Sequence, residues 1–526
     1  MKWGTLLSFG CAAMQFLIPY TNAVPTVDEY MQSRSTAMQA DDATILGGSM
    51  TLSDSREILV NSILMTLKDK EYEEGLDSNG RFFAAAQHFF HSKAAIDGSN
   101  VFKIIKMMPK GAGLHMHDAT VGDVQYIAHN LTREENLYYC VQGWDHLLFH
   151  FFETQPTEGC SETSQWKSVA RLRQDASSDE FVDNWFLSSM SMVTPTPEVA
   201  YPDTNAAWDL FEKKITTISG VINYEKALKD NYYQILQQHY DDNVMYVEMR
   251  GLLSSVYKLN QEELTTLDAL TLYKETTDEF VRDHPDFWGA KYIYAPHRFH
   301  SPDSLQEMIN NASTMKSTYP DYFAGFDLVG QEDKGTPLLG FLPQLLDAAS
   351  KDIKFFFHSG ETDWHGTQID ENVIDAALLN TTRFAHGYAL HSHPHIYEMA
   401  KRNNIATEVC PISNQVLRLV EDLRNHPATN YLREGFPVVV ASDGPGMWGA
   451  AALSHDWYMA FMAIAGKRAD LRFLKQLATN SIRYSAMNSV EQAEALGKWE
   501  VQWDDFLNKV IQEFSTLSDA CMGNEV

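Results

Sequence analysis

The sequence predicts an α/β fold, a (β/α)8 barrel of the TIM type, from about position 109 onward. Eight short apolar runs end in polar or charged residues, and longer amphipathic stretches separate them. Strand–helix alternation repeated eight times is typical of this barrel. The runs 355–357 and 438–440 are continuously apolar, as buried parallel strands require. The candidate strands are 113–117, 244–248, 292–295, 323–329, 353–358, 384–386, 405–410 and 438–442.

Residues 24–108, which precede the predicted barrel (109–526), are expected to form a helical arm. Apolar residues recur at helical spacing between 58 and 67, and Asp54 or Ser55 is a candidate cap for that helix. The stretch 82–96 repeats the pattern. Because the arm carries no dense chemistry, we expect it to serve packing or contact with a partner rather than catalysis.

One connection between the candidate strands is much longer than the others. About 125 residues separate the first strand from the second, against roughly 25 to 50 elsewhere. We interpret about 130–190 as a module inserted in the first loop, because loops tolerate insertions. Cys140 and Cys160 lie 20 residues apart in this polar stretch, which suits a local disulfide in an oxidising compartment. Cys410 ends an apolar run and is expected to be a buried thiol.

The first 23 residues have the pattern of an export signal, so we expect a secreted, extracellular protein. Lys2 supplies the positive start, 6–20 is mostly apolar, and small residues end at Ala23. The alternative is a membrane anchor, but this apolar run is short for a span, and no other segment reaches that length. Three sequons are compatible with glycosylation, at Asn130, Asn311 and Asn380.

The bulk composition restricts the classes of function. The 526 residues are 44% hydrophobic and 12% aromatic, as in a globular protein. The formal net charge of −29 argues against a nucleic-acid-binding surface, which needs a basic face. It argues less strongly against anionic small molecules, since a local pocket can differ from the average field.

Residues that can bind a metal stand at the carboxyl ends of four predicted strands. His115 and His117 are two apart, so on a strand they face the same way and can share one ion. His358, His386 and Asp443 each end another apolar run. A single histidine at a strand end is more often an ordinary polar residue. The prediction of a metal site rests on the occurrence of such residues at four strand ends together, because all these ends converge on the face where barrels place their active sites.

Three neutral imidazoles and one carboxylate suit Zn²⁺ and leave a position for water. The ion lowers the pKa of that water towards about 7, so that hydroxide can attack an electrophilic carbon. Glu361, three residues after His358, and His386 are the candidates for the acid and the base of such a reaction.

The chain resembles the secreted adenosine deaminases, also called adenosine-deaminase-related growth factors, of the metal-dependent amidohydrolase superfamily. The resemblance covers nearly the whole mature chain. It rests on "MPKGAGLHMHDA", "AAWDLFEKK", "VMYVEMRG", "YAPHR", "GFDLVGQE", "FFFHSGETD", "AHGYAL", "EVCPISN" and "ASDGPGMWG", in the family's order. The resemblance implies one zinc ion per subunit, a disulfide-containing insertion and a homodimer formed through the amino-terminal arm.

The family's roles transfer to the positions that match its motifs. The zinc ligands match His115, His117, His358 and Asp443. Glu361 matches the acid that protonates purine N1, and His386 the residue that orients and helps deprotonate the zinc-bound water. Substrate contacts match Trp208, His297 and Gly330, and Asp118 is a further candidate for contact with the sugar. Without the resemblance, Trp208 reads as a core residue of an amphipathic helix.

One position departs from the family pattern. The family has two successive aspartates after the last strand, the second of which binds the purine at N7, but this chain reads Asp443-Gly444. Loss of one buried hydrogen-bond partner costs about 1 to 3 kcal/mol. The substitution is therefore expected to reduce activity or loosen specificity, and AMP becomes a candidate substrate beside adenosine.

The expected function is hydrolytic deamination at purine C6, giving inosine or inosine monophosphate and ammonia. One alternative is another amidohydrolase of the same fold that cuts an amide or an ester. A second is a catalytically weakened member that acts as a growth factor or a purine-binding protein. Nucleobase deaminases with His/Cys/Cys zinc sites are excluded, since their P-C-x-x-C element is absent from the sequence.

Overall fold

The computed structural model describes residues 24–76, 82–143, 145–253 and 255–517, so the predicted signal 1–23 lies outside the described residues. The chain divides into two compact units, residues 1–43 and 44–526. Helix α1 (Val27–Thr44) makes up nearly all of the described part of the first unit. Its amino-terminal turn is closed locally, because the backbone N–H and the hydroxyl of Thr26 donate to Glu29 at 2.8 and 2.9 Å.

The second unit is built on eight parallel strands in two four-stranded sheets. One sheet has the order β1-β5-β6-β7 and the other β11-β10-β9-β8. Isolated parallel bridges, Met116 to Asp443 and Phe326 to Phe355, connect the ends of the two sheets and give the strands one cyclic order. The predicted α/β barrel class is thereby confirmed. The strands are β1 (Gly111–His117), β5 (Val244–Gly251), β6 (Gly289–Tyr294), β7 (Phe323–Phe326), β8 (His358–Ser359), β9 (Arg383–His386), β10 (Ala406–Val409) and β11 (Val438–Val440).

Strand β8 is shorter than the sequence predicts. The apolar run 353–357 lies between β7 and β9, and it bonds to both through Phe326 N to Lys354 O at 2.9 Å and Thr382 N to Phe355 O at 2.7 Å. The hydroxyl of Thr381, however, accepts the N–H of Phe357 at 3.3 Å. A side chain thus takes a bond that a backbone carbonyl would accept in a regular ladder, and only the next two residues, His358 and Ser359, form the strand.

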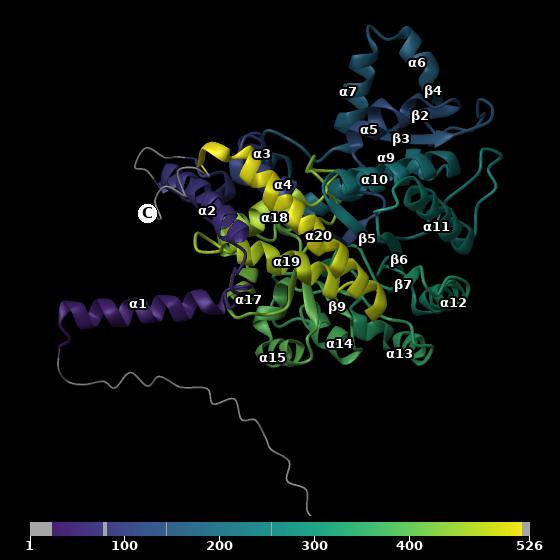
Figure 1. Ribbon diagram of the computed structural model, residues 1–526. Helices are drawn as coiled ribbons and strands as arrows, with labels where there is room; N and C mark the ends of the chain where they lie inside the picture. Colours follow the sequence, from purple (N-terminus) through teal and green to yellow (C-terminus); the bar gives the residue numbers. More distant parts are fainter. Residues whose placement is uncertain (1–23, 77–81, 144, 254, 518–526) are drawn as a thin grey trace, which may run out of the picture. The chain divides into compact units, whose positions relative to one another are not determined.

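Helices follow the strands and cover the outside of the barrel, as Figure 1 shows for α10 to α15 around β5 to β9. Each buries an apolar stripe against the strands and turns polar residues to solvent. Helix α11 begins with a capping box between Thr265 and Asp268. The helices from α9 onward are α9 (Thr204–Ile222), α10 (Glu225–Asp241), α11 (Thr266–Asp283), α12 (Pro302–Thr318), α13 (Leu342–Ser350), α14 (Asn372–Leu378), α15 (Pro394–Arg402), α16 (Pro411–Val416), α17 (Ala428–Arg433), α18 (Ser454–Met459), α19 (Leu471–Arg483) and α20 (Ser489–Glu513).

Three helices precede the barrel within the second unit: α2 (Ser55–Leu76), α3 (Phe89–Asp97) and α4 (Asn100–Met107). Asp54 accepts the N–H of Arg56 at 2.8 Å and so caps α2, as one of the two predicted alternatives has it. The predicted helix 82–96 is only partly helical, with the short 3₁₀ turn η1 (Ala84–Ala86) before α3. Lys68 of α2 is fully buried and donates to the carbonyls of Phe461, Gly466 and Ala469, which anchors α2 on the π-helical segment η7 (Ala460–Ile464).

The long connection between β1 and β5 contains a small antiparallel sheet of order β3-β2-β4. Figure 1 shows its strands grouped with α6 and α7. A disulfide joins Cys140 to Cys160, as predicted. The hydroxyl of Thr217 on α9 donates to the carbonyl of Leu147 at 2.7 Å and ties this sheet to the barrel helices. The elements are α5 (Val124–His129), β2 (Leu137–Gln142), β3 (His146–Phe151), β4 (Lys167–Ser168), α6 (Val169–Asp175), α7 (Asp179–Met190) and α8 (Pro197–Ala200).

Among the described helices, none combines the length and the apolar character that a membrane span needs. The remaining short turns are η2 (Leu131–Arg133), η3 (Glu332–Lys334), η4 (Leu338–Phe341), η5 (Tyr388–Ser392) and η6 (Leu423–Asn425). Of these, η3 follows β7 at the carboxyl ends of the strands and contributes to the site described next.

Candidate active site

The metal-type residues predicted from the sequence lie together at the carboxyl ends of the strands. His117 Nε2 lies 3.2 Å from His115 Nε2 and 3.2 Å from Asp443 Oδ1. The ring of His358 is centred 4.7 Å from that of His115. His386 is next to both, with its ring centre 4.9 Å from that of His115. Residues from β1, β8, β9 and the end of β11 therefore meet at one point, although up to 328 positions separate them in the sequence.

Two of these residues have an uncommon backbone conformation. His386 has φ +62° and Asp443 has φ +60°, in the left-handed region that side chains other than glycine rarely adopt. Such conformations cluster at functional sites, where the surrounding structure holds them. Here the turn directs each side chain from the end of its strand, β9 or β11, into the centre of the barrel mouth.

Buried carboxylates orient two of the histidines. Glu408 Oε2 lies 2.8 Å from His115 Nδ1, and Asp327 Oδ2 lies 2.6 Å from His358 Nδ1. Each imidazole therefore donates its Nδ1–H to a carboxylate and presents an unprotonated Nε2 to the centre of the cluster. This arrangement is usual for histidines that bind a metal, because the second hydrogen bond fixes both the tautomer and the ring orientation.

Arg250 of β5 joins the two orienting carboxylates. Its guanidinium lies 2.8 Å from Glu408 Oε2 and 3.4 Å from Asp327 Oδ2. Arg383 of β9 contacts Glu408 on its other oxygen. All four side chains are fully buried. Buried charges persist only when they are paired. Despite burial, the two arginines and His115 hold the pKa of Glu408 well below its usual range, whereas burial raises the pKa of Asp327 and the charge of Arg250 opposes that rise.

Glu361 lies beside the cluster with one oxygen unpaired. Its Oε1 is buried without a hydrogen-bond partner among the described residues and lies 3.5 Å from His386 Nε2. Burial, together with the charges of Asp443 and Glu332, raises the pKa of the Glu361 carboxyl well above its usual range. The loop that carries it is fixed by Glu332, which accepts the backbone N–H groups of Gly360 and Glu361 at 3.0 and 2.6 Å. The surroundings of Glu361 therefore favour its protonated form and hold it in place as a candidate acid.

A series of hydrogen bonds leads from the backbone N–H of Ala428 through His426 and Asn414 to His386. The N–H of Ala428 donates to Nδ1 of His426 at 3.0 Å, and Nε2 of His426 lies 3.0 Å from Oδ1 of Asn414. The Asn414 amide nitrogen then lies 3.3 Å from Nδ1 of His386. Burial lowers the pKa of both histidines, that of His426 to about 3, so both are neutral. Because this series of hydrogen bonds starts from a backbone N–H, which can only donate, it places the proton of His386 on Nε2. That nitrogen faces Glu361.

A pocket opens above these groups, and one face of α9 forms part of its wall. Trp208, Phe211, Glu212 and Ile215 recur at helical spacing on that face. The predicted contacts Trp208, His297, Gly330 and Asp118 all line the pocket. The complete lining is His117, Asp118, Ala119, Thr120, Trp208, Phe211, Glu212, Ile215, Gly251, Leu252, Ala295, His297, Val329, Gly330, His358, Glu361, His386 and Asp443.

Two of the lining residues, His297 and Gly330, lie next to each other in the pocket wall. His297 has a buried Nδ1 without a partner among the described residues. Gly330 has φ +98°, and a Cβ at that position would lie 2.8 Å from the ring of Phe299 and 3.2 Å from His297 Nδ1. Any other residue at 330 would be strained in its backbone and would crowd the wall that His297 forms.

Asp118 is held rigidly at the pocket wall. Its Oδ2 accepts hydrogen bonds from the hydroxyls of Tyr273 at 2.9 Å and Tyr292 at 2.6 Å. A Cβ on Gly251 would lie 1.9 Å from the same oxygen, so only glycine leaves room for the carboxylate. The arrangement fixes Asp118 as a hydrogen-bonding group of constant orientation beside the mouth of β1.

Gly444, the position that departs from the family pattern, is not among the residues that line the pocket. A Cβ on Gly444 would lie 2.7 Å from Thr120 Oγ1 and 3.1 Å from the ring of Trp448. Thr120 does line the pocket. Its side chain therefore covers Gly444 and takes the space that a larger residue at 444 would need.

Sequence reasoning missed several residues of the site. Glu408 and Asp327 were not singled out, although each is a carboxylate within or directly after a buried apolar strand, which is itself a signal. Asn414 stands in a quoted motif, but its role depends on His426, which only the three-dimensional structure brings near. Glu212 was hidden in an ordinary amphipathic helix.

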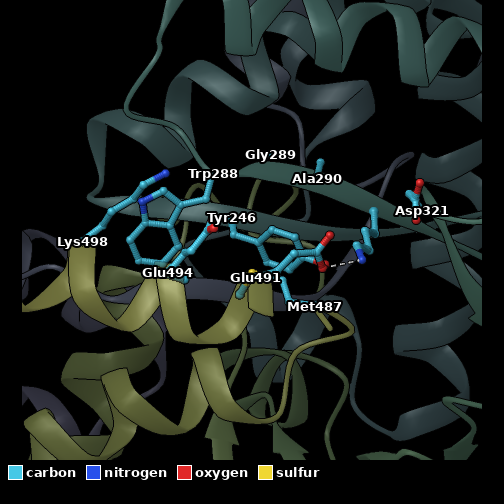
Figure 2. Close-up of a pocket in the computed structure, with 11 residues that line it drawn as sticks. Tyr246, Trp288, Gly289, Ala290, Asp321, Met487, Glu491, Glu494 and Lys498 are labelled. Atoms are coloured by element: carbon cyan, nitrogen blue, oxygen red, sulfur yellow. Dashed lines mark hydrogen bonds and ion pairs between the residues drawn. The ribbon is translucent and has the colours of Figure 1, made fainter. Parts of the chain in front are cut away.

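A second cavity, of about 160 Å³, lies at the opposite, amino-terminal ends of the strands (Figure 2). Tyr246 and Gly289 near the starts of β5 and β6 line it, together with Glu491 and Glu494 of α20. Glu491, labelled in Figure 2, accepts a hydrogen bond from Lys291 at 2.8 Å. None of the histidines of the cluster lines this cavity, so the candidate active site is the pocket at the carboxyl ends.

The donors of the cluster fit a divalent metal ion. His115, His117 and His358 offer nitrogen atoms within 4.8 Å of one another, and Oδ1 of Asp443 joins them. The other oxygen of Asp443 accepts the hydroxyl of Ser413 at 2.6 Å, so Oδ1 alone faces the imidazoles. Three nitrogens and one carboxylate oxygen form a set that zinc commonly takes in catalytic sites.

The fold and this donor set are those of a barrel hydrolase with a candidate metal-binding centre at the carboxyl ends of its strands. Comparison with known proteins agrees. Residues 191–499 match the family model "Adenosine deaminase", and residues 12–105 match "Adenosine/AMP deaminase N-terminal". Adenosine deaminase 2 of Homo sapiens is 40% identical over 91% of this chain and 93% of its own length. An adenosine deaminase of Aedes albopictus is 39% identical over 93% of this chain and 90% of its own.

Solved structures show the same fold at lower identity. The N6-mAMP deaminase of Arabidopsis has a TM-score of 0.54 and 14% identity, covering 76% of this chain and 99% of its own. An amidohydrolase from Burkholderia ambifaria with bound Zn has a TM-score of 0.54 and 16% identity, covering 78% and 95%. This chain belongs to the adenosine deaminase family, and it is a purine deaminase acting on adenosine-like purines.

Proposed function

We propose that this protein converts adenosine to inosine and ammonia by hydrolysis, with one zinc ion per subunit held by His115, His117, His358 and Asp443. The observation that carries the proposal is the meeting of three of these donors with Glu361 and His386 at one pocket, where the fourth, His115, lies with its Nε2 3.2 Å from that of His117. When bound, zinc lowers the pKa of water and so supplies a hydroxide nucleophile at neutral pH.

Two residues of the chain, Glu361 and His386, provide the proton donors that the reaction needs. Burial and neighbouring carboxylates raise the pKa of Glu361 and so favour its protonated form, and its Oε1, unpaired among the described residues, faces the pocket. It therefore donates a proton to N1 of the purine, which makes C6 more electrophilic. His386 carries its proton on Nε2 and orients the attacking oxygen by donating a hydrogen bond to it. Apolar walls from Trp208, Phe211 and Val329 hold the base and exclude water.

The lining of the pocket favours a nucleoside over a nucleotide. None of the residues that line it is a lysine or an arginine, and away from the metal donors and Glu361 it carries the carboxylates Asp118 and Glu212. A 5′-phosphate needs paired cations or backbone donors to offset its loss of hydration. We therefore propose adenosine, rather than AMP, as the preferred substrate.

An absorbance assay with metal control tests the function. Purified protein is mixed with adenosine, and the change of the ultraviolet spectrum to that of inosine is followed. We expect turnover that stops when a chelator removes zinc and returns with one equivalent of the ion. Zinc-loaded protein that binds inosine but does not convert adenosine would instead favour the purine-binding or growth-factor alternative.

We further propose that the protein is exported and glycosylated. Support comes from the signal pattern of 1–23, from the Cys140–Cys160 disulfide, and from the exposure of all three sequon asparagines, Asn130, Asn311 and Asn380. Expression in a eukaryotic cell tests this: we expect protein in the medium that begins at Val24 and shrinks on deglycosylation. Protein retained inside the cell with residues 1–23 attached would contradict it.

A homodimer formed through the helical segment 24–108 is the remaining proposal, and it rests on the family resemblance. Light scattering of the full-length protein and of a variant lacking residues 24–43 distinguishes the outcomes. We expect a dimer for the first and a smaller species for the second, while two monomers would contradict the proposal.

A further inference from the structure

One acidic side chain in the pocket wall has no partner. Glu212 lies on α9 between Phe211 and Ile215, in the lining of the pocket. Among the described residues its carboxylate makes no hydrogen bond and no ion pair, and the side chain is half-buried. Burial alone raises the pKa of this carboxyl. A carboxylate left without a partner in a partly apolar wall is costly unless it serves a ligand.

The cations nearest to Glu212 in sequence are engaged elsewhere. Lys213 pairs with Asp145 at 2.6 Å, and Lys214 donates to the carbonyl of Ser188 at 2.5 Å. Neither of them lines the pocket. The negative charge of Glu212 is therefore not neutralised by any residue that the structure describes, and it acts on whatever enters the pocket.

We propose that Glu212 is the residue that makes this site select uncharged adenosine over anionic adenine nucleotides. The inference rests on the proposed deaminase function. An anion brought near an unpaired carboxylate in a poorly solvated wall is repelled, and at an effective dielectric of about 20 two unit charges even 8 Å apart interact by roughly 2 kcal/mol. A neutral nucleoside meets no such penalty, and its hydroxyls can donate to the carboxylate.

A series of substrates that differ only in charge measures this effect. The three probes are 5′-amino-5′-deoxyadenosine, adenosine and AMP, with a positive, a neutral and a negative 5′ group. For the wild type we expect kcat/KM to fall in that order. In Glu212→Gln the ratio of kcat/KM for AMP to that for adenosine should rise about tenfold, mainly through KM, and Glu212→Lys should raise it further.

A matched control separates a local effect from the field of the whole chain. Asp209→Asn removes the same charge one turn earlier on α9, from a side chain that is 75% exposed, pairs with Lys334 and does not line the pocket. We expect its AMP-to-adenosine ratio to stay within twofold of the wild type. Raising the salt concentration should narrow the wild-type discrimination, because Glu212 is only half-buried.

Product binding gives a readout that does not need turnover. Inosine and inosine monophosphate are titrated while the fluorescence of the protein, which has Trp208 in the pocket, is followed. Glu212→Gln should lower the ratio of the dissociation constant of inosine monophosphate to that of inosine about tenfold. If wild-type protein converts none of the three substrates, the proposed function fails, and the product titration still decides the role of Glu212. An AMP-to-adenosine or product ratio that is the same in wild type and Glu212→Gln overturns the inference.

Discussion

The side-chain amide of Asn414 lies 3.3 Å from Nδ1 of His386, and this contact determines which nitrogen of the histidine carries the proton. The donor-to-acceptor direction of this series of hydrogen bonds is set by the backbone N–H of Ala428, which can only donate and does so to Nδ1 of His426. His426 must then donate from Nε2 to the oxygen of Asn414, which leaves the amide nitrogen to face His386. His386 therefore presents Nε2–H to the pocket.

Replacement of Asn414 is expected to lower kcat by roughly tenfold to a hundredfold, as loss of an orienting partner does at such sites. Asn414→Leu leaves the tautomer of His386 unspecified, and Asn414→Asp should move the proton to Nδ1. ¹⁵N NMR of the histidines reports the tautomer, and zinc content reports the integrity of the site. An Asn414→Asp protein with His386 still protonated on Nε2 would contradict the account.

Glu361→Gln should reduce kcat by about a hundredfold to ten-thousandfold, since an amide cannot give up a proton as a general acid does. Burial and the charges of Asp443 and Glu332 raise the pKa of Glu361, so the active, protonated form persists to higher pH than for an ordinary glutamate. Wild-type kcat should therefore fall as the pH rises through that elevated pKa. The pH–rate profile checks this, and a residual Glu361→Gln activity with the same alkaline limb would assign the acid to another residue.

His426 should make the protein lose stability in mild acid. Burial lowers its folded pKa to about 3, whereas the unfolded chain titrates near 6.5. Its contribution is complete above pH 6.5 and is lost as the pH falls towards 3, at about 1.4 kcal/mol per pH unit. Urea unfolding of wild type and His426→Gln between pH 6.5 and 5 measures the difference. Parallel pH dependences for the two proteins would show that the histidine is not buried in the neutral form.

Gly444 should tolerate no larger side chain while Thr120 is present. Gly444→Ala places a Cβ 2.7 Å from Thr120 Oγ1, and such overpacking typically costs about 1 to 3 kcal/mol of unfolding free energy. Thr120→Gly should relieve most of that cost in the double variant. A double-mutant cycle by chemical denaturation tests the coupling. Additive effects would mean that the two side chains do not compete for this space.

Much of the fold followed from local pattern. Each of the eight predicted apolar runs overlaps one strand, because parallel strands buried on both faces must be continuously apolar. The boundaries were less accurate where side chains intervene. The hydroxyl of Thr381 takes the N–H of Phe357, and this shortens β8 to two residues. A hydrophobicity pattern contains no such contact.

The residues of the site also fall into a group that local pattern predicts and a group that it does not. The predicted metal and acid–base residues stand at strand ends, and the parallel barrel brings strand ends together whatever their distance in sequence. The residues that orient them were missed. Asn414 acts through His426, and Glu408 acts through two arginines from other strands, so their roles depend on packing that no single segment encodes. The surroundings of Gly444 also depend on such packing, since Thr120 covers the position.

Anomalous diffraction at the zinc edge from crystals grown with one equivalent of the ion tests the central claim most directly. The account predicts a single strong peak within bonding distance of His115 Nε2, His117 Nε2, His358 Nε2 and Asp443 Oδ1. A peak at other residues, or an active protein with no peak at this position, would contradict it.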